Sequence, residues 1–465
     1  MSKFPLVLLF LFLLSCDTNS DDDSMTPPQA ALPDIPQLQS WLEGFCATPH
    51  RIIGTDNWKQ GVQFIEQEFS EMGFENVIKD EFPITVWEAD DWSLRVGEQS
   101  FRCYYEFGTG FTDLDGETGK LTYIGDKLDA NERVANKIVL VDMPFGLTNG
   151  EVNPFLRPNH LGNREDELIS LLDVYWQLKD RFAKGVIFIL SNSLTNNPEY
   201  TYPRSDDSEW PIPSLFVGKD VGEELKLLAD VNNDATIVLT GRRSSGTGIN
   251  IWVKLEGRSD DTYIFSTHGD SPFKGIIEDG TGVVSVLAQA FYWKDVPAEE
   301  RPNDMIFVVT ASHFYNSDGG SRLFREQHPD IMEQTKLLLV LEHLGAKEHS
   351  FSNCKLITEE DPMDWLIYHS SGAVVPEIDN LSNDYLPVDG LRAVETNTFP
   401  LSAALGFVFE DRNNPLPKPN NYVSILTAPW YLITSEDTFD KVDYPELLEA
   451  NQAIMRMSKR YMESL

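Results

Sequence analysis

Cysteine, positive charge and long apolar stretches are all scarce in this sequence of 465 residues. Four cysteines cannot make a disulfide scaffold in a chain of this length, although Cys46, Cys103 and Cys354 leave room for one disulfide and one free thiol. Lys and Arg total 37 against 74 Asp and Glu, which argues against nucleic-acid binding, because phosphate contacts need clustered cations. Beyond the N-terminus, no stretch approaches the roughly 20 apolar residues of a membrane span.

Three catalytic signatures are also absent. The sequence contains no Gly-x-Ser-x-Gly turn, no His-Glu-x-x-His pair and no Gly-x-x-x-x-Gly-Lys loop. These absences exclude, in turn, a serine hydrolase with a nucleophile elbow, a zinc protease with both histidines on one helix, and a P-loop site. With 41% hydrophobic and 11% aromatic residues, the chain still has ample material for a globular core.

The N-terminus has the pattern of a secretory signal. Lys3 precedes an apolar run over residues 4–14, which is too short to span a bilayer, and Ser15-Cys16 follows. The pattern resembles a bacterial lipoprotein signal, so we expect residues 1–15 to be a signal peptide and Cys16 to become the lipidated first residue. An ordinary signal peptide with an incidental cysteine is the alternative. The expected location is the cell envelope, with a lipid anchor on the periplasmic face or at the cell surface.

Apolar patterning predicts the organisation of the rest of the chain. Residues 16–36 are acidic and contain several prolines, which predicts a flexible tether. Apolar residues at helical spacing predict a helix over residues 61–72. From residue 249 onward, apolar strands alternate with helices, at residues 263–266, 282–293, 305–310, 321–326 and 336–341. Strands of this kind predict an α/β fold, with a mixed, mostly parallel sheet that has helices on both faces.

The most informative motif begins where the strand at residues 263–266 ends, in Thr267-His268-Gly269-Asp270. Ligand-binding loops in open α/β sheets gather at the carboxyl ends of strands. Asp270 stands where its carboxylate can orient the imidazole of His268 as a metal ligand. On its own, this short motif is more typical of a structural histidine.

The wider pattern resembles the di-zinc aminopeptidase, glutamate carboxypeptidase and transferrin receptor family, metallopeptidase family 28. The matching segments are residues 268–282, His50-Arg51 with Gly54-Thr55, residues 435–443, and residues 104–245, which are similar to a protease-associated domain. The resemblance implies a peptidase-like domain made of residues 37–103 and 246–465, with a small β-rich domain inserted at residues 104–245.

Part of the family's metal site is retained. The family holds two zinc ions, which share one aspartate and have one histidine each. By resemblance, His268 is the first histidine, Glu278 replaces the shared aspartate, and Glu342 replaces a further aspartate. Zinc accepts oxygens from either acid at about 2.0–2.2 Å. His268, Glu278 and Glu342 are therefore the predicted ligands of at most one zinc ion, with Asp270 behind His268.

The rest of the family's site is missing. Ser312 and His313 stand where the family has paired glutamates, which act as general base and ligand, and Thr396 stands where it has its last histidine. A serine hydroxyl stays protonated near neutral pH, so Ser312 cannot take a proton from zinc-bound water. The resemblance therefore does not imply the family's two-metal peptidase mechanism.

Two interpretations remain open. In the first, the fold is kept for binding a peptide or protein ligand, and the chain is a pseudo-enzyme with at most one metal ion. In the second, a rearranged single-metal site hydrolyses peptides or amides outside the cytoplasm, with His313 or His343 as its base.

Overall fold

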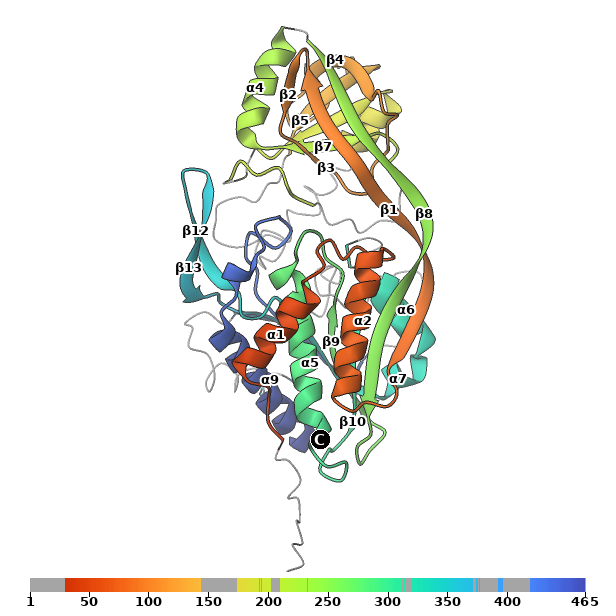
Figure 1. The fold of residues 1–465 in the computed structure, drawn as a ribbon, viewed down its shortest axis with the longest axis vertical. Helices are drawn as coiled ribbons and strands as arrows, with labels where there is room; N and C mark the ends of the chain where they lie inside the picture. The colour runs from red at the N-terminus through yellow and green to blue at the C-terminus, as the bar shows by residue number, and fades with distance from the viewer. Residues whose placement is uncertain are drawn as a thin grey trace, which may run out of the picture.

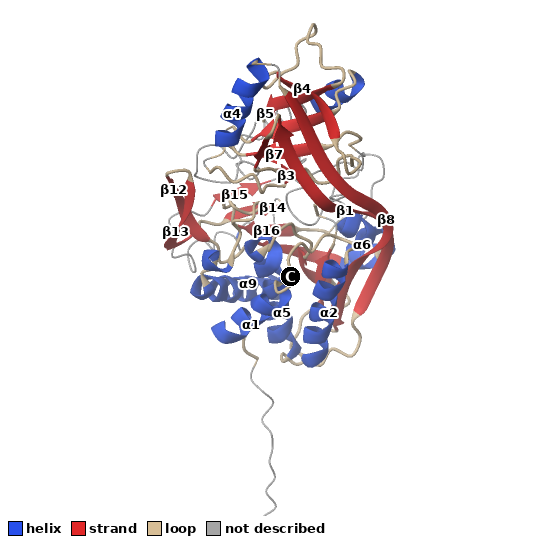
Figure 2. Ribbon diagram, turned by 45° about the horizontal axis from the view of Figure 1, so that its top comes forward, coloured by secondary structure: helices blue, strands red, loops and turns tan. Residues whose placement is uncertain are grey.

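Two bodies joined by a long ribbon make up the protein (Figure 1). The computed structural model describes residues 30–143, 174–191, 193, 195–201, 210–231, 233–311, 313–314, 319–370, 374, 376, 392–395 and 419–464. The ribbon consists of two antiparallel strands, β1 (Ile78–Val96) and β8 (Asp234–Leu255). It runs from the lower body, which contains the long helices, to an upper body that is mainly strands (Figures 1 and 2).

The lower body is a sheet between two helical layers. Its further elements are α1 (Ile35–Phe45), α2 (Asp56–Glu71), β9 (Thr262–His268), the π-helical turn η3 (Ile276–Gly280), α5 (Thr281–Lys294), β10 (Asp304–Thr310), α6 (Gly319–Gln327), α7 (Pro329–Gln334), β11 (Thr335–Glu342), β14 (Leu366–His369), β15 (Arg392–Glu395), β16 (Tyr422–Leu426), the 3-10 turn η5 (Phe439–Lys441) and α9 (Tyr444–Ser464). A separate hairpin is formed by β12 (Lys347–Ser352) and β13 (Lys355–Pro362).

The main sheet is mixed and mostly parallel. Its strand order is β15-β14-β16-β11-β9-β10-β8, with β1 beside β8. Four central strands run parallel to one another, namely β10, β9, β11 and β16. On either side of them, β8 is antiparallel to β10, and β14 is antiparallel to β16. This arrangement, with helices on both faces, confirms the fold class predicted from the sequence.

Alternate side chains of the central strands point to opposite faces of the sheet, and each face has its own apolar core. Phe265, Phe307 and Leu339 belong to the core that includes residues of α1, α2, α5 and α9. Ile264 and Ile306 face the opposite way, toward Phe324 of α6 and other residues of that second core. Because both faces are covered, the strands are apolar throughout, which is why they appear as continuous apolar runs in the sequence.

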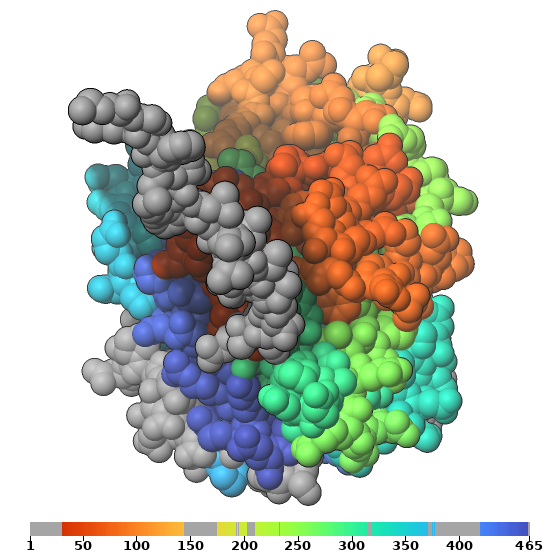
Figure 3. Space-filling view, turned by 60° about the horizontal axis from the view of Figure 1, so that its bottom comes forward, coloured from red at the N-terminus to blue at the C-terminus, as the bar shows by residue number. Residues whose placement is uncertain are grey.

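The two ends of the described chain meet on one side of the lower body. Helices α1 and α9 pack against each other, and Figure 3 shows their surfaces side by side at the lower end of the molecule. Both helices also contact α5, so the first and last helices enclose the helix that follows the candidate site.

The upper body contains short strands and one helix. Its elements are β2 (Gln99–Phe101), β3 (Tyr104–Tyr105), β4 (Glu117–Tyr123), β5 (Lys137–Asp142), β6 (Gly185–Ile189), β7 (Ser214–Val217) and α4 (Lys219–Asp230). Strands β4 to β7 are parallel in sequence order, and β3 pairs with β7 in the antiparallel sense.

The ribbon makes the strands of both bodies one continuous hydrogen-bonded path. One end of β8 pairs with β4 and the other end pairs with β10, so the upper strands are an extension of the main sheet. The expected boundaries at residues 104 and 245 do not coincide with breaks, since β1 reaches the upper body before residue 104 and β8 passes residue 245 without interruption. An inserted domain with those limits stays a prediction.

Local chemistry explains where α2 begins. The apolar stripe predicted a helix over residues 61–72, but α2 begins at Asp56, because the hydroxyl of Thr55 accepts a hydrogen bond from the Trp58 backbone N–H at 3.3 Å. Trp58 is buried and extends the apolar stripe by one turn.

The described residues show the state of three cysteines and the character of the helices. Cys46, Cys103 and Cys354 are all free thiols, so the disulfide for which the sequence left room is not formed. Among the described helices, none combines the length and the apolar character that crossing a bilayer requires.

Candidate functional site

Three neighbouring parallel strands bring the candidate residues together. β9 ends at His268 and β11 ends at Glu342, and β10 lies beside β9 with Thr310 paired to His268. The carboxyl ends of parallel strands meet at the same edge of a sheet. His268 and Glu342 are both fully buried there, which makes this edge a closed, low-dielectric site.

His268 and Glu278 are in direct contact, as the predicted ligand set requires. The Nε2 atom of His268 lies 3.1 Å from Oε1 of Glu278, although the contact does not have hydrogen-bond geometry. Burial by itself lowers the pKa of His268, but the carboxylates of Asp270 and Glu278 outweigh it and hold the pKa well above its ordinary value. Burial likewise raises the pKa of Glu278, and the charges of His343 and His268 reverse this, so Glu278 stays ionised.

Asp270 holds His268 differently from the sequence expectation. The His268 Nδ1 atom lies 3.1 Å from the backbone carbonyl of Asp270, whereas the carboxylate is 3.7 Å away. The Asp270 carboxylate instead accepts hydrogen bonds from the backbone N–H groups of His313 and Phe314, at 2.9–3.1 Å. The expected carboxylate–imidazole contact is therefore replaced by a carbonyl contact, because backbone donors occupy the carboxylate.

His343 is turned toward the same carboxylate as His268. Its Nε2 atom lies 2.8 Å from Oε2 of Glu278, and its Nδ1 atom lies 3.0 Å from the backbone carbonyl of Thr427. Burial lowers the pKa of His343, but the charge of Glu278 outweighs it and raises the pKa to about 10. The residue expected as a candidate base is thus placed among the candidate ligands.

Burial is electrostatically unfavourable for the carboxylate of Glu342. It is fully buried, and neither carboxylate oxygen has a hydrogen-bond partner among the described residues. Burial raises the pKa of Glu342 to about 8, although His268 and His343 act in the opposite direction. Buried polar atoms normally find a partner, so an orphaned carboxylate beside two imidazoles fits a site that holds a cation.

His313, the other candidate base, is stacked on His268. The two ring centroids are 4.1 Å apart and the ring planes are 15° from parallel. Burial, together with the charge of His268, lowers the pKa of His313 to about 3, so its ring is neutral. Ser312, Thr396 and Cys16 lie outside the described residues.

Within the part of the chain that the structure describes, donor atoms come together in two trios that share His268. One trio is His268, Glu278 and His313, and the other is His268, Glu342 and His343; within each, the ligand atoms lie within 4.8 Å of one another. The predicted set of His268, Glu278 and Glu342 is therefore divided between them, and each trio contains a histidine that the prediction did not count as a ligand.

Two acids that were not singled out as site residues hold the loops of the site. The Asp437 carboxylate accepts hydrogen bonds from the backbone N–H groups of Ile277 and Glu278, at 2.9–3.1 Å. Asp279 accepts one from the Thr267 hydroxyl and another, at 3.0 Å, from the His343 N–H. Asp437 belongs to the C-terminal segment that carried the resemblance, and Asp279 directly follows Glu278, so proximity to those motifs was the available signal.

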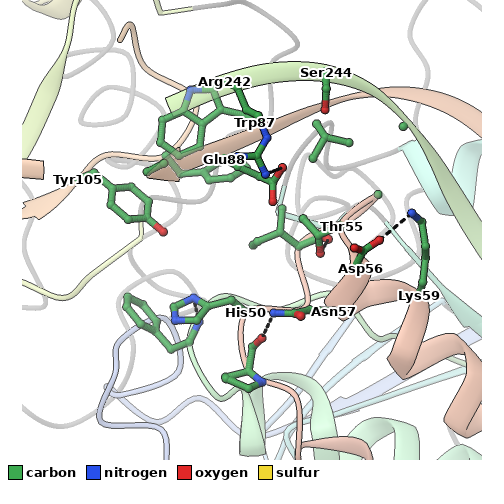
Figure 4. Close-up of a pocket in the computed structure, with 18 of the residues that line it drawn as sticks. His50, Thr55, Asp56, Asn57, Lys59, Trp87, Glu88, Tyr105, Arg242 and Ser244 are labelled. Carbon is green, nitrogen blue, oxygen red and sulfur yellow. Dashed lines mark hydrogen bonds and ion pairs between the residues drawn. The ribbon is translucent and has the colours of Figure 1, made fainter. Parts of the chain in front are cut away.

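A cleft of about 1160 Å³ lies between the ribbon and the start of α2. In Figure 4, Trp87, Glu88 and Arg242 of the ribbon face Thr55 and His50 across it. Its lining also includes Phe273 and Lys274, which belong to the loop between His268 and Glu278. The cleft therefore shares a loop with the candidate metal ligands.

The fold is an α/β architecture like that of zinc aminopeptidases. The structure is similar to a zinc aminopeptidase from Bacillus subtilis (TM-score 0.66, 16% identity, 92% of this chain and 96% of that one). It is also similar to a Peptidase M28 precursor from Shewanella amazonensis SB2B (TM-score 0.67, 17% identity, 92% and 94%) and to an aminopeptidase from Aneurinibacillus sp. strain AM-1 (0.61, 16%, 92% and 94%).

Sequence comparison adds no closer relative. Neither the scan against protein-family models nor the search of curated proteins finds a match. At 16–17% identity, the structural likeness establishes the fold, while the chemistry of the site has to be argued from this chain's own residues.

Proposed function

We propose that this chain is a binding protein on the zinc-aminopeptidase fold, which holds one zinc-class ion and does not hydrolyse peptides by a two-metal mechanism. The observation that supports the ion most directly is the buried carboxylate of Glu342, orphaned among the described residues beside the imidazoles of His268 and His343. His268, Glu278 and Glu342 would hold the ion. When bound, zinc polarises a carbonyl or a water molecule.

The second ion of a two-metal site has too few ligands in this sequence. Ser312 and Thr396 are not zinc ligands of the usual kinds, which are Cys, His, Asp and Glu. His313 is the only acid or histidine at these three positions, and its ring is stacked on His268. The shared Glu278 and His313 are too few ligands to hold a second ion tightly, so the two-metal reaction is not expected.

The candidate bases also argue against the rearranged hydrolase. A general base works best when its pKa lies near the working pH, and the pKa of His313 is lowered to about 3. His343 has its Nε2 atom 2.8 Å from Glu278 and its Nδ1 atom 3.0 Å from the Thr427 carbonyl, so both ring nitrogens face protein groups of the candidate metal site. These contacts favour the binding role over single-metal hydrolysis.

The cleft beside the site provides a place for a ligand. Its volume of about 1160 Å³ exceeds that of an ordinary small-molecule pocket, which suits a peptide or a segment of a protein. Trp87 and Tyr105 supply apolar ring surface, while Arg242 and Glu88, paired at 2.7 Å, supply hydrogen-bonding groups at the ribbon. With its lipidated Cys16, the protein would present this cleft at the cell envelope.

Metal content and hydrolysis, measured together on the purified full chain, test this proposal. We expect at most one zinc ion per chain by elemental analysis after dialysis, loss of that ion in His268→Ala, and no turnover of a pooled aminoacyl substrate library. Two tightly bound ions with robust aminopeptidase turnover would contradict the proposal. One ion with slow turnover that His313→Ala abolishes without releasing the ion would support the hydrolase instead.

A further inference from the structure

His343 is the residue of the site that the resemblance does not explain. We propose that His343 is a ligand of the ion, in one set with His268 and Glu342. His313, the other added histidine, lies outside that set. This inference rests on the proposed function, since it names the residues that hold the proposed ion.

The ring orientations support a ligand role for both histidines. His343 directs Nδ1 at the Thr427 carbonyl at 3.0 Å, and His268 directs Nδ1 at the Asp270 carbonyl at 3.1 Å. A carbonyl accepts a hydrogen bond, so Nδ1 carries the proton in each ring, and Nε2 is left for another partner. Metal-binding histidines are usually held in this way, by a hydrogen bond from the other ring nitrogen.

The ligand atoms of His268, Glu342 and His343 lie within 4.8 Å of one another, and both imidazoles are also next to Glu278. Nε2 of His343 lies 2.8 Å and Nε2 of His268 lies 3.1 Å from the two oxygens of Glu278. Ligands about 2.0–2.2 Å from a zinc ion are separated by roughly 3.0–3.5 Å, so small shifts bring these atoms to coordinating positions. Glu278 therefore lies next to the ion, with one oxygen close to Nε2 of His343 and the other close to Nε2 of His268.

The backbone at His343 explains how two successive residues reach one site. Successive side chains of a strand point to opposite faces, which would direct Glu342 and His343 apart. His343 instead has a φ of +56°, in the left-handed region that residues other than glycine seldom adopt. Its N–H donates to Asp279 at 3.0 Å and its carbonyl accepts from the Thr427 hydroxyl, which hold this conformation. A strained conformation held at a site is consistent with a functional demand on the side chain.

The stacking of His313 on His268 excludes a shared ion. An imidazole binds a metal ion in the plane of its ring, about 2.0–2.1 Å from the nitrogen. The two planes are only 15° from parallel, and the rings lie one above the other with centroids 4.1 Å apart. Such planes do not meet near either ring, so an ion in the plane of His268 is out of the plane of His313. Of the two trios, only the one with His343 can bind as a unit.

Two imidazoles and a carboxylate define the class of ion. Nitrogen ligands favour Zn²⁺, Co²⁺ and Ni²⁺, whereas Mg²⁺ and Ca²⁺ prefer sites made of oxygens. The site should therefore take up Co²⁺, whose visible absorption reports the number and kind of its ligands.

The test measures Zn²⁺ affinity by competition with a chromophoric chelator, and the Co²⁺ spectrum, on the full chain and three variants. His343→Gln removes the proposed ligand but fills the space, His313→Ala removes the stacked ring, and His349→Ala is a matched control, since His349 is buried against Phe351 and Tyr431 and belongs to neither trio. We expect one ion in the unmodified chain, an affinity at least 100-fold lower with an altered Co²⁺ spectrum in His343→Gln, and an unchanged spectrum with affinity within about threefold in the other two.

Folding and metal binding are separated by a second measurement. Far-ultraviolet circular dichroism should be the same for all variants, while Zn²⁺ should raise the melting temperature of every chain except His343→Gln. An unaltered affinity and Co²⁺ spectrum in His343→Gln, or loss of the ion in His313→Ala, would overturn the assignment while leaving a one-ion protein. An unmodified chain that binds no Zn²⁺ or Co²⁺ would overturn the proposed function and this assignment together.

Discussion

At the residue scale, four histidines fall into two groups according to their charged neighbours. His268 and His343 contact a carboxylate, which raises the pKa of each ring in spite of burial. His313 and His349 have no such contact, and burial lowers their pKa values to about 3 and about 4. The ring of His349 packs against Phe351 and Tyr431, so it is a neutral core residue. The pKa of the same side chain is therefore shifted in opposite directions at different places in one fold.

His349 gives a prediction about stability and pH. Burial, and then the charge of Lys441, lowers its pKa in the folded protein to about 4, whereas an unfolded histidine titrates near 6.5. Between these values the unfolded chain binds the extra proton, so stability falls as the pH drops from about 6.5 toward 4. We expect the unfolding free energy of the natural chain, relative to His349→Phe, to decrease by roughly 1–3 kcal/mol between pH 7 and pH 4.5.

Urea titrations of the natural chain and His349→Phe at matched pH values measure this difference, and groups common to both chains cancel in the comparison. A difference in unfolding free energy that stays constant across the pH range would show that the ring is solvated in the folded protein.

At the element scale, the segment before α2 positions the loop of the candidate site. Arg51 is fully buried, and its guanidinium donates to the backbone carbonyls of Lys274 and Gly275 at 2.8 Å and of Gly269 at 3.2 Å. These carbonyls belong to the loop between β9 and Glu278. The Arg51 motif that carried part of the resemblance thus holds the loop that connects two candidate ligands, rather than meeting the ion itself.

The start of α2 gives a prediction about helix capping. The Thr55 hydroxyl accepts from the Trp58 N–H at 3.3 Å and donates to the Ile52 carbonyl at 2.6 Å. Thr55→Ala should lower the unfolding free energy by about 1 kcal/mol, the usual cost of losing such a cap. Ser70→Ala is the control, because Ser70 is exposed and its hydroxyl bonds within the same helix. Equal chemical stability of the two variants would mean that the cap does not contribute.

At the scale of the whole molecule, the upper body is joined to the lower one close to the site. Tyr200 forms a β-bridge with Thr434, and the Ser435 N–H donates to the Glu199 carbonyl at 3.2 Å. Asp437, which holds the Glu278 backbone, follows two residues later. Together with the ribbon, this contact places the cleft and the candidate metal site within one connected structure, so the upper body belongs to the site's surroundings.

The N-terminus gives a prediction about how the protein is attached to the membrane. If Cys16 carries the lipid anchor, Cys16→Ala should move the protein from the membrane fraction to the soluble fraction, because the acyl chains supply the membrane affinity. Fractionation followed by immunoblotting measures the change, and Cys354→Ala is the control, since Cys354 is an exposed thiol within the described fold. A Cys16→Ala protein that stays with the membrane would contradict a lipid anchor at this position.

By itself, the sequence predicted the central strands and helices and three candidate donor residues, His268, Glu278 and Glu342. Apolar runs are local, so β9, β10 and β11 could be predicted from their own residues, and His268 follows from the rule that ligand-binding loops gather at the carboxyl ends of such strands. Glu342 was predicted from its place in the family pattern that the sequence resembles. Glu278 was found by its position in a motif. The extent of α2 was underestimated, because a capping hydroxyl outside the apolar stripe decides where a helix begins.

Only the tertiary structure decided which donors converge. The direction of the His343 ring depends on a left-handed backbone and on Thr427, which is 84 residues away in sequence. Glu278 is held by Asp437, at a separation of 159 residues. The ring of His313 stacks on the ring of His268, which lies at the end of another strand, and this stacking keeps His313 out of the proposed ligand set. These features are contacts between distant segments, and sequence patterns report the local backbone, so the choice of ligands depends on how the chain packs.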